Sequence, residues 1–163
     1  MTPSLEISVH PFAALFPRMT DADLADLVAD LGQNALIHPI ALDATGAIID
    51  GIDRLKACEL AGIKPEFEKI EGDPVAFIVA ANMSRRDMSA GQKAMALAMI
   101  FPKPSKRGKK GRPNPFAGLE FSKQRLSNAR LVLRHSRPLA EQVLAGVLKL
   151  DAALRKVSPG VRR

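Results

Sequence analysis

A strand-to-helix turn near the middle of the sequence has the chemistry to bind an anion. The turn Ile49-Asp50-Gly51 follows a predicted strand and opens a predicted helix that carries Arg54 one turn in. A helix N-terminus presents unpaired backbone N–H groups to an anion, and a guanidinium can add a bidentate contact. The turn is therefore a candidate phosphate site at Gly51 and Arg54. The alternative is that Gly51 only permits the turn, while Arg54 pairs with a surface carboxylate.

A helix in the last third of the sequence has the chemistry to bind nucleic acid. From Ser122 onward, basic and small polar residues recur at helical spacing on one face, namely Lys123, Ser127, Arg130 and Arg134. Apolar residues recur on another face, namely Leu126, Ala129 and Leu133, and can pack on the next helix. An outward face of the first kind, with Gln124 and Asn128 beside it, has the size and chemistry to enter a major groove.

The charge distribution assigns nucleic-acid binding to the same region. Residues 1–101 contain 8 Lys and Arg against 14 Asp and Glu, a net −6, whereas residues 102–163 contain 16 against 3, a net +13. Cations that neutralise phosphates drive nucleic-acid binding, so we expect double-stranded DNA as the partner. A solvated basic tail and a docking tail for an acidic protein are the alternatives. The predicted DNA contacts are Lys106, Arg107, Lys109, Lys110, Arg112, Lys123, Gln124, Ser127, Asn128, Arg130 and Arg134.

The remaining reactive residues predict neither a disulfide nor a metal site. The single cysteine, Cys58, cannot form an internal disulfide or a multi-cysteine zinc site. The three histidines, His10, His38 and His135, lack the spacing of metal ligands. No stretch approaches the roughly 18 apolar residues that a membrane span needs. We therefore expect a cytoplasmic protein with no membrane contact.

Local signals predict helices and strands ahead of the basic region. Thr20 resembles a helix cap for a helix that ends near Gly32, and residues 39–43 and 47–50 are typical of a hairpin. Residues 52–61 predict a helix that stops at Gly62, and residues 65–70 predict a strand. Asp73 with Pro74 opens a helix through about residue 85, and Ser89 begins a helix that reaches residue 101.

The sequence therefore predicts an α+β protein with a helical appendage. Segment 103–115 is rich in Lys, Arg, Gly and Pro and lacks apolar periodicity, which is typical of a linker. Residues 122–133, 138–145 and 151–157 predict three short helices. We expect a domain over residues 1–101, a basic linker over 102–115, a helical region over 116–157 and a basic tail over 158–163.

Three motifs in the first domain resemble a known superfamily. The strings LIHPIAL, GAIIDGIDRLKACELAGI and ANMSRRDMSAGQKA occur in this order. Together they resemble the N-terminal domain of ParB proteins, in the ParB/sulfiredoxin superfamily, which implies a small mixed sheet with helices. The resemblance assigns nucleotide phosphates, with CTP and Mg²⁺ as the implied ligand, to Gly51, Arg54, Asn82 and Arg85, and Arg86 can add a further cation.

The helical region is similar to the helix-turn-helix segment of ParB-like proteins, through the string FSKQRLSNARLVLRHSRPLAEQVLAGVLKLDAALRKV. That similarity implies DNA binding in plasmid, phage or chromosome partition, or in transcriptional regulation. It also implies a partner ATPase and a homodimer.

Two enzyme activities of the superfamily would each need particular residues in this chain. Sulfiredoxin chemistry needs a cysteine nucleophile where this chain has Ile52, so that activity is excluded. A nucleotide hydrolase or nuclease is the alternative function, and a nuclease would need Asp43, Asp50 and Asp53 to converge on divalent metal ions.

Overall fold

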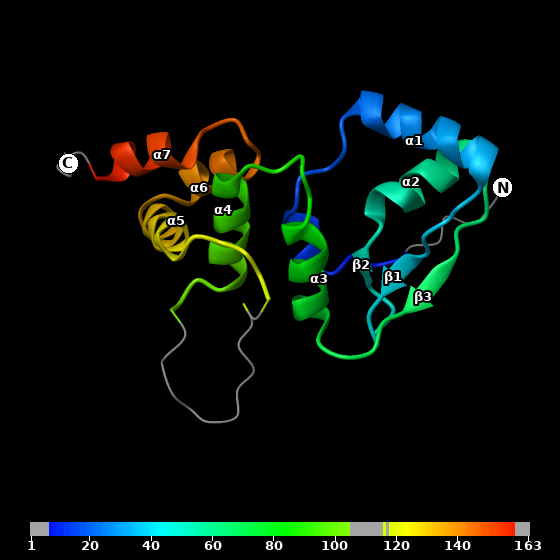
Figure 1. The fold of residues 1–163 in the computed structure, drawn as a ribbon, viewed down its shortest axis with the longest axis horizontal. Coiled ribbons are helices and arrows are strands. Elements are labelled where there is room, and N and C mark those ends of the chain that lie inside the picture. Colours follow the sequence, from blue (N-terminus) through cyan, green and yellow to red (C-terminus); the bar gives the residue numbers. More distant parts are fainter. Residues whose placement is uncertain (1–6, 105–115, 117, 159–163) are drawn as a thin grey trace. The chain divides into compact units, whose positions relative to one another are not determined.

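The computed structural model describes residues 7–104, 116 and 118–158. They form two compact units, divided between Ile78 and Val79. None of the helices in these described ranges is long and apolar enough to cross a membrane. The structure is α+β, with a small mixed sheet in the first unit and a group of helices in the second (Figure 1).

The sheet of the first unit has three short strands in the order β2-β1-β3. Strands β1 (Ile40–Leu42) and β2 (Ile48–Asp50) pair antiparallel, as the predicted hairpin requires. Strand β3 (Phe67–Lys69) pairs parallel to β1. Ile40 and Ile48 are fully buried, so the centre of the sheet is the core of this unit.

The hairpin turn is held by one buried carboxylate. Asp43 Oδ1 accepts hydrogen bonds from the backbone N–H of Thr45 at 2.8 Å, from the Thr45 hydroxyl at 2.6 Å and from the Ala47 N–H at 3.0 Å. The Thr45 hydroxyl is the main reason why the pKa of Asp43 lies below its usual value, because these bonds favour the ionised form. Asp43 is therefore a structural residue of the turn.

Two helices complete the first unit beside a short 3-10 turn, η1 (Ala13–Leu15). Helix α1 (Asp21–Asn34) begins where the Thr20 side chain accepts a hydrogen bond from the Asp23 N–H. Helix α2 (Ile52–Ala61) ends at Gly62, which adopts the left-handed conformation. Leu31 of α1 packs on Ala57 and Cys58 of α2, and α2 in turn contacts β1.

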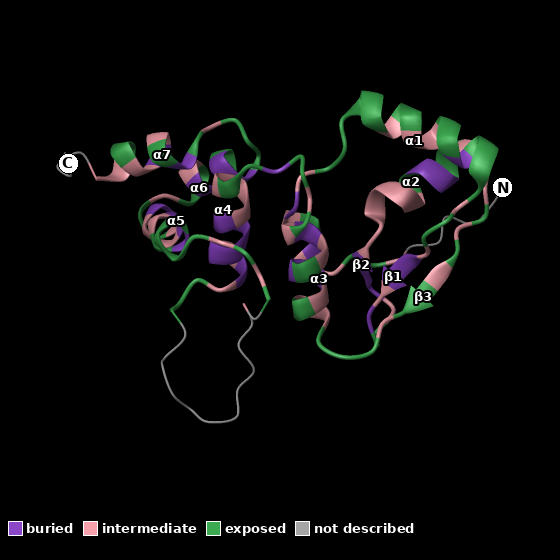
Figure 2. Ribbon diagram, viewed as in Figure 1, coloured by how far each residue is buried: buried purple, intermediate pink, exposed green. Residues whose placement is uncertain are grey.

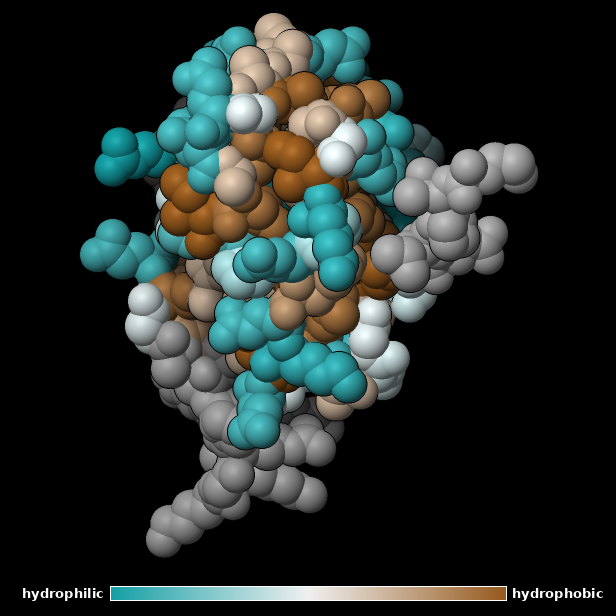
Figure 3. Space-filling view, turned by 90° about the vertical axis from the view of Figure 1, so that its right-hand side faces the viewer, coloured by the Kyte–Doolittle hydropathy of each residue, from teal (hydrophilic) through white to brown (hydrophobic). Residues whose placement is uncertain are grey.

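Some apolar side chains of the first unit are exposed to solvent. Ile37 is 70% exposed and Leu60 is 57% exposed. Ile37 follows Leu36, and Leu60 precedes Ala61. Leu36 and Ala61 both pack on the core between α1 and α2. Figure 3, which views the molecule from the right-hand side of Figure 1, shows apolar surface among hydrophilic side chains.

Helix α3 (Pro74–Met83) contains the division between the units. It starts as the sequence predicts, because Asp73 Oδ1 accepts a hydrogen bond from the Val75 N–H at 2.9 Å. It ends at Met83, two residues before the predicted end. Ile78 and Val79 are its most buried residues.

Four helices form the second unit: α4 (Ala90–Ile100), α5 (Lys123–His135), α6 (Arg137–Leu144) and α7 (Leu150–Val157). Helix α4 contacts each of the other three, and its residues 94–98 are all buried (Figure 2). By packing, α4 therefore shares a core with the helices that follow it. The division of the chain into a domain over residues 1–101 and a helical region over residues 116–157 remains a prediction.

Long-range contacts join the elements of the second unit. The Gln92 side chain accepts from the Ser89 N–H at 2.9 Å, as a capping box does, and donates to the Leu144 carbonyl at 3.2 Å. The rings of Phe101 and Phe116 meet edge to face with centroids 5.1 Å apart, and Phe116 lies 5.1 Å from Phe121. These aromatic contacts join the end of α4 to the start of α5.

Candidate functional site

The predicted phosphate turn has a backbone conformation that strongly favours glycine. Gly51 precedes α2 with φ +95°, a conformation that side chains rarely adopt. The Arg54 side chain folds back over it, so that a Cβ on Gly51 would lie 2.8 Å from Arg54 Nη2 and 2.9 Å from Nε. Gly51 therefore has two roles here: it permits the turn, and it leaves room for the guanidinium.

The guanidinium of Arg54 is paired with a carboxylate. Arg54 Nη2 lies 2.7 Å from Asp50 Oδ2, and the two side chains are 25% and 40% exposed. Arg54 Nε is buried and has no hydrogen-bond partner among the described residues. The carboxylate pairing is the contact that the alternative reading of the sequence expects. Phosphate binding at this turn remains a prediction.

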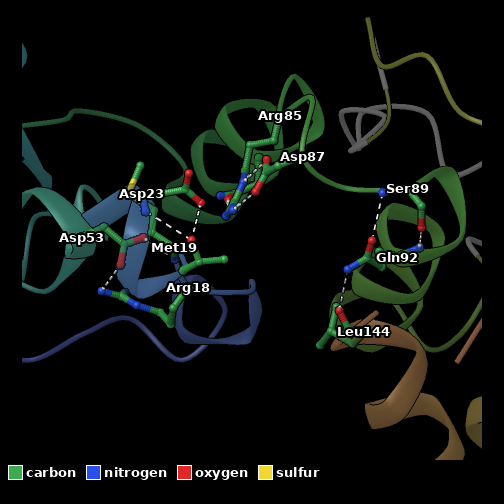
Figure 4. A network of polar contacts seen from close by, with 11 residues as sticks. Arg18, Met19, Asp23, Asp53, Arg85, Asp87, Ser89, Gln92 and Leu144 are labelled. Carbon is green, nitrogen blue, oxygen red and sulfur yellow. Dashed lines mark hydrogen bonds and ion pairs between the residues drawn. The ribbon is translucent and has the colours of Figure 1, made fainter. Parts of the chain in front are cut away.

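The other acidic residue of the turn binds elsewhere. Asp53 Oδ1 lies 2.6 Å from Arg18 Nη2, and its Oδ2 accepts from the Met19 N–H at 3.4 Å (Figure 4). Asp53 thus fastens α2 to the segment that precedes α1. No local pattern in the sequence indicates this contact, because the partners are 34 and 35 positions away.

The second predicted phosphate group lies in the second unit, with Asn82 in the last turn of α3 and Arg85 and Arg86 just after the helix. Asn82 is buried, Arg85 is half-buried and Arg86 is exposed. Arg85 donates from Nε to Asp87 Oδ1 at 3.0 Å and from Nη2 to Asp87 Oδ2, and its Nη1 lies 3.5 Å from Asn82 Oδ1. Hydrogen bonding to Arg85 holds the pKa of Asp87 below its usual value. Gly51 and Arg54, by contrast, belong to the first unit.

The exposed side of α5 carries most of the polar residues that the sequence predicted there. Lys123, Gln124, Ser127 and Arg134 are exposed. Asn128 is half-buried, and its Oδ1 accepts from Gln124 Nε2 at 3.0 Å. The predicted contacts Lys106, Arg107, Lys109, Lys110 and Arg112 lie outside the described residues.

One exposed cation of α5 was missed. Arg125 is exposed near the helix start, where its N–H donates to the Ser122 hydroxyl that caps the helix. It lies on another side of the helix from Lys123, because position 125 is about 200° around the axis from position 123. The polar repeat Lys123, Ser127, Arg130 and Arg134 therefore did not include it.

Arg130 does not lie on the outward stripe that the spacing predicted. Its Nε donates to the Phe101 carbonyl at 2.9 Å, and its Nη2 is buried without a hydrogen-bond partner in the described ranges. Burial lowers the pKa of Arg130. The reason is tertiary: α5 packs on α4, so a position at the edge of the apolar face is half-covered. Arg130 therefore anchors α5 to the end of α4.

The apolar face of α5 is buried as predicted at Leu126 and Ala129, but Val132 rather than Leu133 is its third fully covered residue. This face packs on α4 and α7 as well as on α6, the one partner that the sequence predicted.

The acidic residues considered for metal-dependent cleavage have separate partners. Asp43 holds the hairpin turn, Asp50 pairs with Arg54, and Asp53 pairs with Arg18. Over the residues that could be searched, no group of three or more His, Cys, Asp or Glu side chains is placed to hold a metal ion. Cys58 is fully buried, and burial raises the pKa of its thiol, which favours a packing role.

Comparison with solved structures identifies the fold. The chain is similar to the C2221 form of a Pnob8-like ParB-N domain, with a TM-score of 0.56 and 18% identity, over 91% of this chain and 75% of that chain. The chain has a ParB-N fold. A C-terminally truncated chromosome-partitioning protein ParB from Caulobacter crescentus, complexed with CTP-gamma-S, matches with a TM-score of 0.40 and 20% identity, over 93% and 87% of the two chains.

Sequence comparisons add nothing to this result. No family model matches the chain. No curated protein matches it either. The ParB-N fold confirms the α+β class and the small mixed sheet that the three motifs implied. Because the identity to these structures is low, the similarity shows the fold alone, and the function depends on the residues of this chain.

Proposed function

We propose that this chain is a ParB-like DNA-binding protein and that α5 is the element that contacts double-stranded DNA. The observation that carries the proposal is the exposed side of α5, where two cations, Lys123 and Arg134, lie beside the hydroxyl of Ser127 and the amide of Gln124. The sequence of α5 contains no acidic residue, so nothing on the helix offsets these charges. Cations bind phosphates, and amides can read base edges.

The packing of α5 supports a recognition role. Its buried face packs on α4, α6 and α7, and Arg130 fixes its middle to the Phe101 carbonyl. A rigid support of this kind keeps the exposed side chains in one orientation, which sequence-specific readout needs. In our proposal α5 is the recognition helix of a helix-turn-helix-like region, and the described cations act together with the basic residues of segment 102–115.

Binding to labelled duplex DNA tests the proposal. Arg134→Gln and Lys123→Gln should each weaken binding, because each removes a phosphate contact. Asn128→Ala should cost about 1–3 kcal/mol on the preferred sequence and little on random DNA, if the amide reads a base. Arg137→Gln is the matched control, since Arg137 lies in the same unit but already pairs with Glu141 at 3.0 Å. Equal losses in all four variants would refute α5 as the contact element.

We also propose that the chain binds a nucleotide, CTP with Mg²⁺. The candidate phosphate contacts are Gly51 and Arg54 in the first unit and, separately, Asn82, Arg85 and Arg86 at the end of α3 and just after it. The support is the strand-to-helix turn, where an arginine folds over a glycine and backbone N–H groups open a helix. This proposal also rests on the ParB-like motifs of the sequence. A cytoplasmic homodimer with a partner ATPase, acting in partition or in transcriptional control, is the wider role that we propose.

Calorimetry with CTP, ATP and GTP, with and without Mg²⁺, tests nucleotide binding. We expect CTP to bind best and Arg54→Ala to abolish its heat, because the substitution removes a cation from the turn. Lys56→Ala is the control, since Lys56 lies on the same helix and pairs with Glu59. Heat that Arg54→Ala leaves unchanged would show that the nucleotide binds elsewhere in the chain.

A further inference from the structure

Two of the three arginines proposed for nucleotide phosphates, Arg54 and Arg85, already bind a carboxylate of their own chain. Arg54 Nη2 lies 2.7 Å from Asp50 Oδ2, and Arg85 donates hydrogen bonds from Nε and Nη2 to the two carboxylate oxygens of Asp87. The partners are four and two positions away in sequence, so each pair is local to its own unit. The guanidinium groups that would bind phosphate are therefore occupied by an internal anion.

We propose that Asp50 and Asp87 are specificity-determining residues that compete with the ligand for these arginines. This inference rests on the proposed nucleotide function and states which chemical class of ligand these arginines select. A carboxylic-acid ligand carries one negative charge, as the aspartate does. It would have no advantage in charge over an aspartate that the chain already holds beside the arginine. A phosphoryl group brings more charge and three acceptor oxygens, so it can displace the aspartate. The chemical class that the site accepts is thus a phosphate or polyphosphate rather than a carboxylic acid.

The competing carboxylates contribute little to the stability of the fold. Their side chains are 40% and 62% exposed, and ion pairs at such exposure contribute little to folding. Asp43 differs, because its buried oxygen accepts three hydrogen bonds in the hairpin turn. Removing the charge of Asp50 or Asp87 should therefore remove a competing anion without unfolding the chain, and the melting temperature of each variant checks this.

Titration of the full chain with inorganic pyrophosphate tests the inference. Asp50→Asn and Asp87→Asn should each tighten binding by about two- to fivefold, the range that an exposed ion pair is worth. The gain in Asp50→Asn should disappear when Arg54→Ala is added. The Nε–H resonance of Arg54, followed by NMR, reports the occupied site directly and separates it from pyrophosphate bound by the basic second unit.

Two variants control for the change in net charge. Glu59→Gln frees Lys56, and Glu141→Gln frees Arg137, so each alters the charge of the chain by the same amount at a pair outside the proposed site. Neither should tighten pyrophosphate binding at Arg54. Acetate, the carboxylic-acid probe, should bind the wild type too weakly to measure.

The possible results separate this inference from the nucleotide proposal. If the wild type ignores every nucleotide but Asp50→Asn gains pyrophosphate binding at Arg54, the competition is real and the nucleotide proposal is wrong. If the wild type binds CTP and both asparagine variants bind pyrophosphate no better than Glu59→Gln, the competition is overturned while the nucleotide proposal stands. If the wild type binds no nucleotide and no variant binds pyrophosphate at either arginine, both are overturned.

Discussion

At the scale of single residues, the structure separates cations of α5 that the sequence presents as equivalent. Arg130 and Arg134 are one helical turn apart, yet Arg134 is exposed and Arg130 is tied to the carbonyl of Phe101. Helical spacing assigned both to one face, and it cannot show how far a neighbouring helix covers the edge of that face. The carbonyl partner is 29 positions away, so no local pattern contains it.

The two arginines should respond differently to substitution. Arg130→Ala should lower the free energy of unfolding by about 1–3 kcal/mol, because it removes the hydrogen bond to Phe101 and leaves a half-buried carbonyl without that donor. Arg134→Ala, the matched control, should leave stability within about 0.5 kcal/mol and weaken DNA binding instead. Urea unfolding and duplex binding of both variants measure this. An Arg130→Ala protein as stable as the wild type would contradict the anchoring role.

At the scale of elements, the features that the sequence predicted best are those with local causes. Thr20 and Ser89 cap α1 and α4 through side chains that bind the backbone three positions on, and Gly62 ends α2 in the left-handed conformation. The parallel pairing of β3 with β1 and the packing of α4 with α5 could not be read from the sequence, since they depend on contacts between distant segments. The same holds for the pairing of Asp53 with Arg18.

The start of α4 illustrates how a local cap gains a tertiary role. Ser89→Ala removes one capping hydrogen bond and should lower stability by about 1 kcal/mol. Gln92→Ala should lower it further, because Gln92 also donates to the Leu144 carbonyl, 52 positions away. Thermal unfolding of both variants checks the order, with the exposed Ser127→Ala as control. A larger loss for Ser89→Ala than for Gln92→Ala would show that the contact to Leu144 adds nothing.

At the scale of the whole molecule, charge divides along the same line as packing. Residues 1–78 contain 5 Lys and Arg against 13 Asp and Glu, a net −8, and residues 79–163 contain 19 against 4, a net +15. The sequence already showed this asymmetry, because charge needs no fold to be counted. What the structure adds is that the exposed cations of α5 belong to a packed helical unit, and a fixed set of cations gives a defined number of phosphate contacts.

That number can be measured from the salt dependence of DNA binding. If about 5 to 8 cations contact phosphates, the logarithm of the association constant should fall with the logarithm of salt concentration at a slope of about −4.5 to −7. Lys123→Gln with Arg134→Gln should reduce the slope by close to 2, because two counterion-releasing contacts are lost. Lys56→Gln with Lys64→Gln removes the same charge from the acidic unit and should leave the slope unchanged. If both pairs reduce the slope equally, binding follows the net charge of the chain, and α5 is not the surface that the DNA contacts.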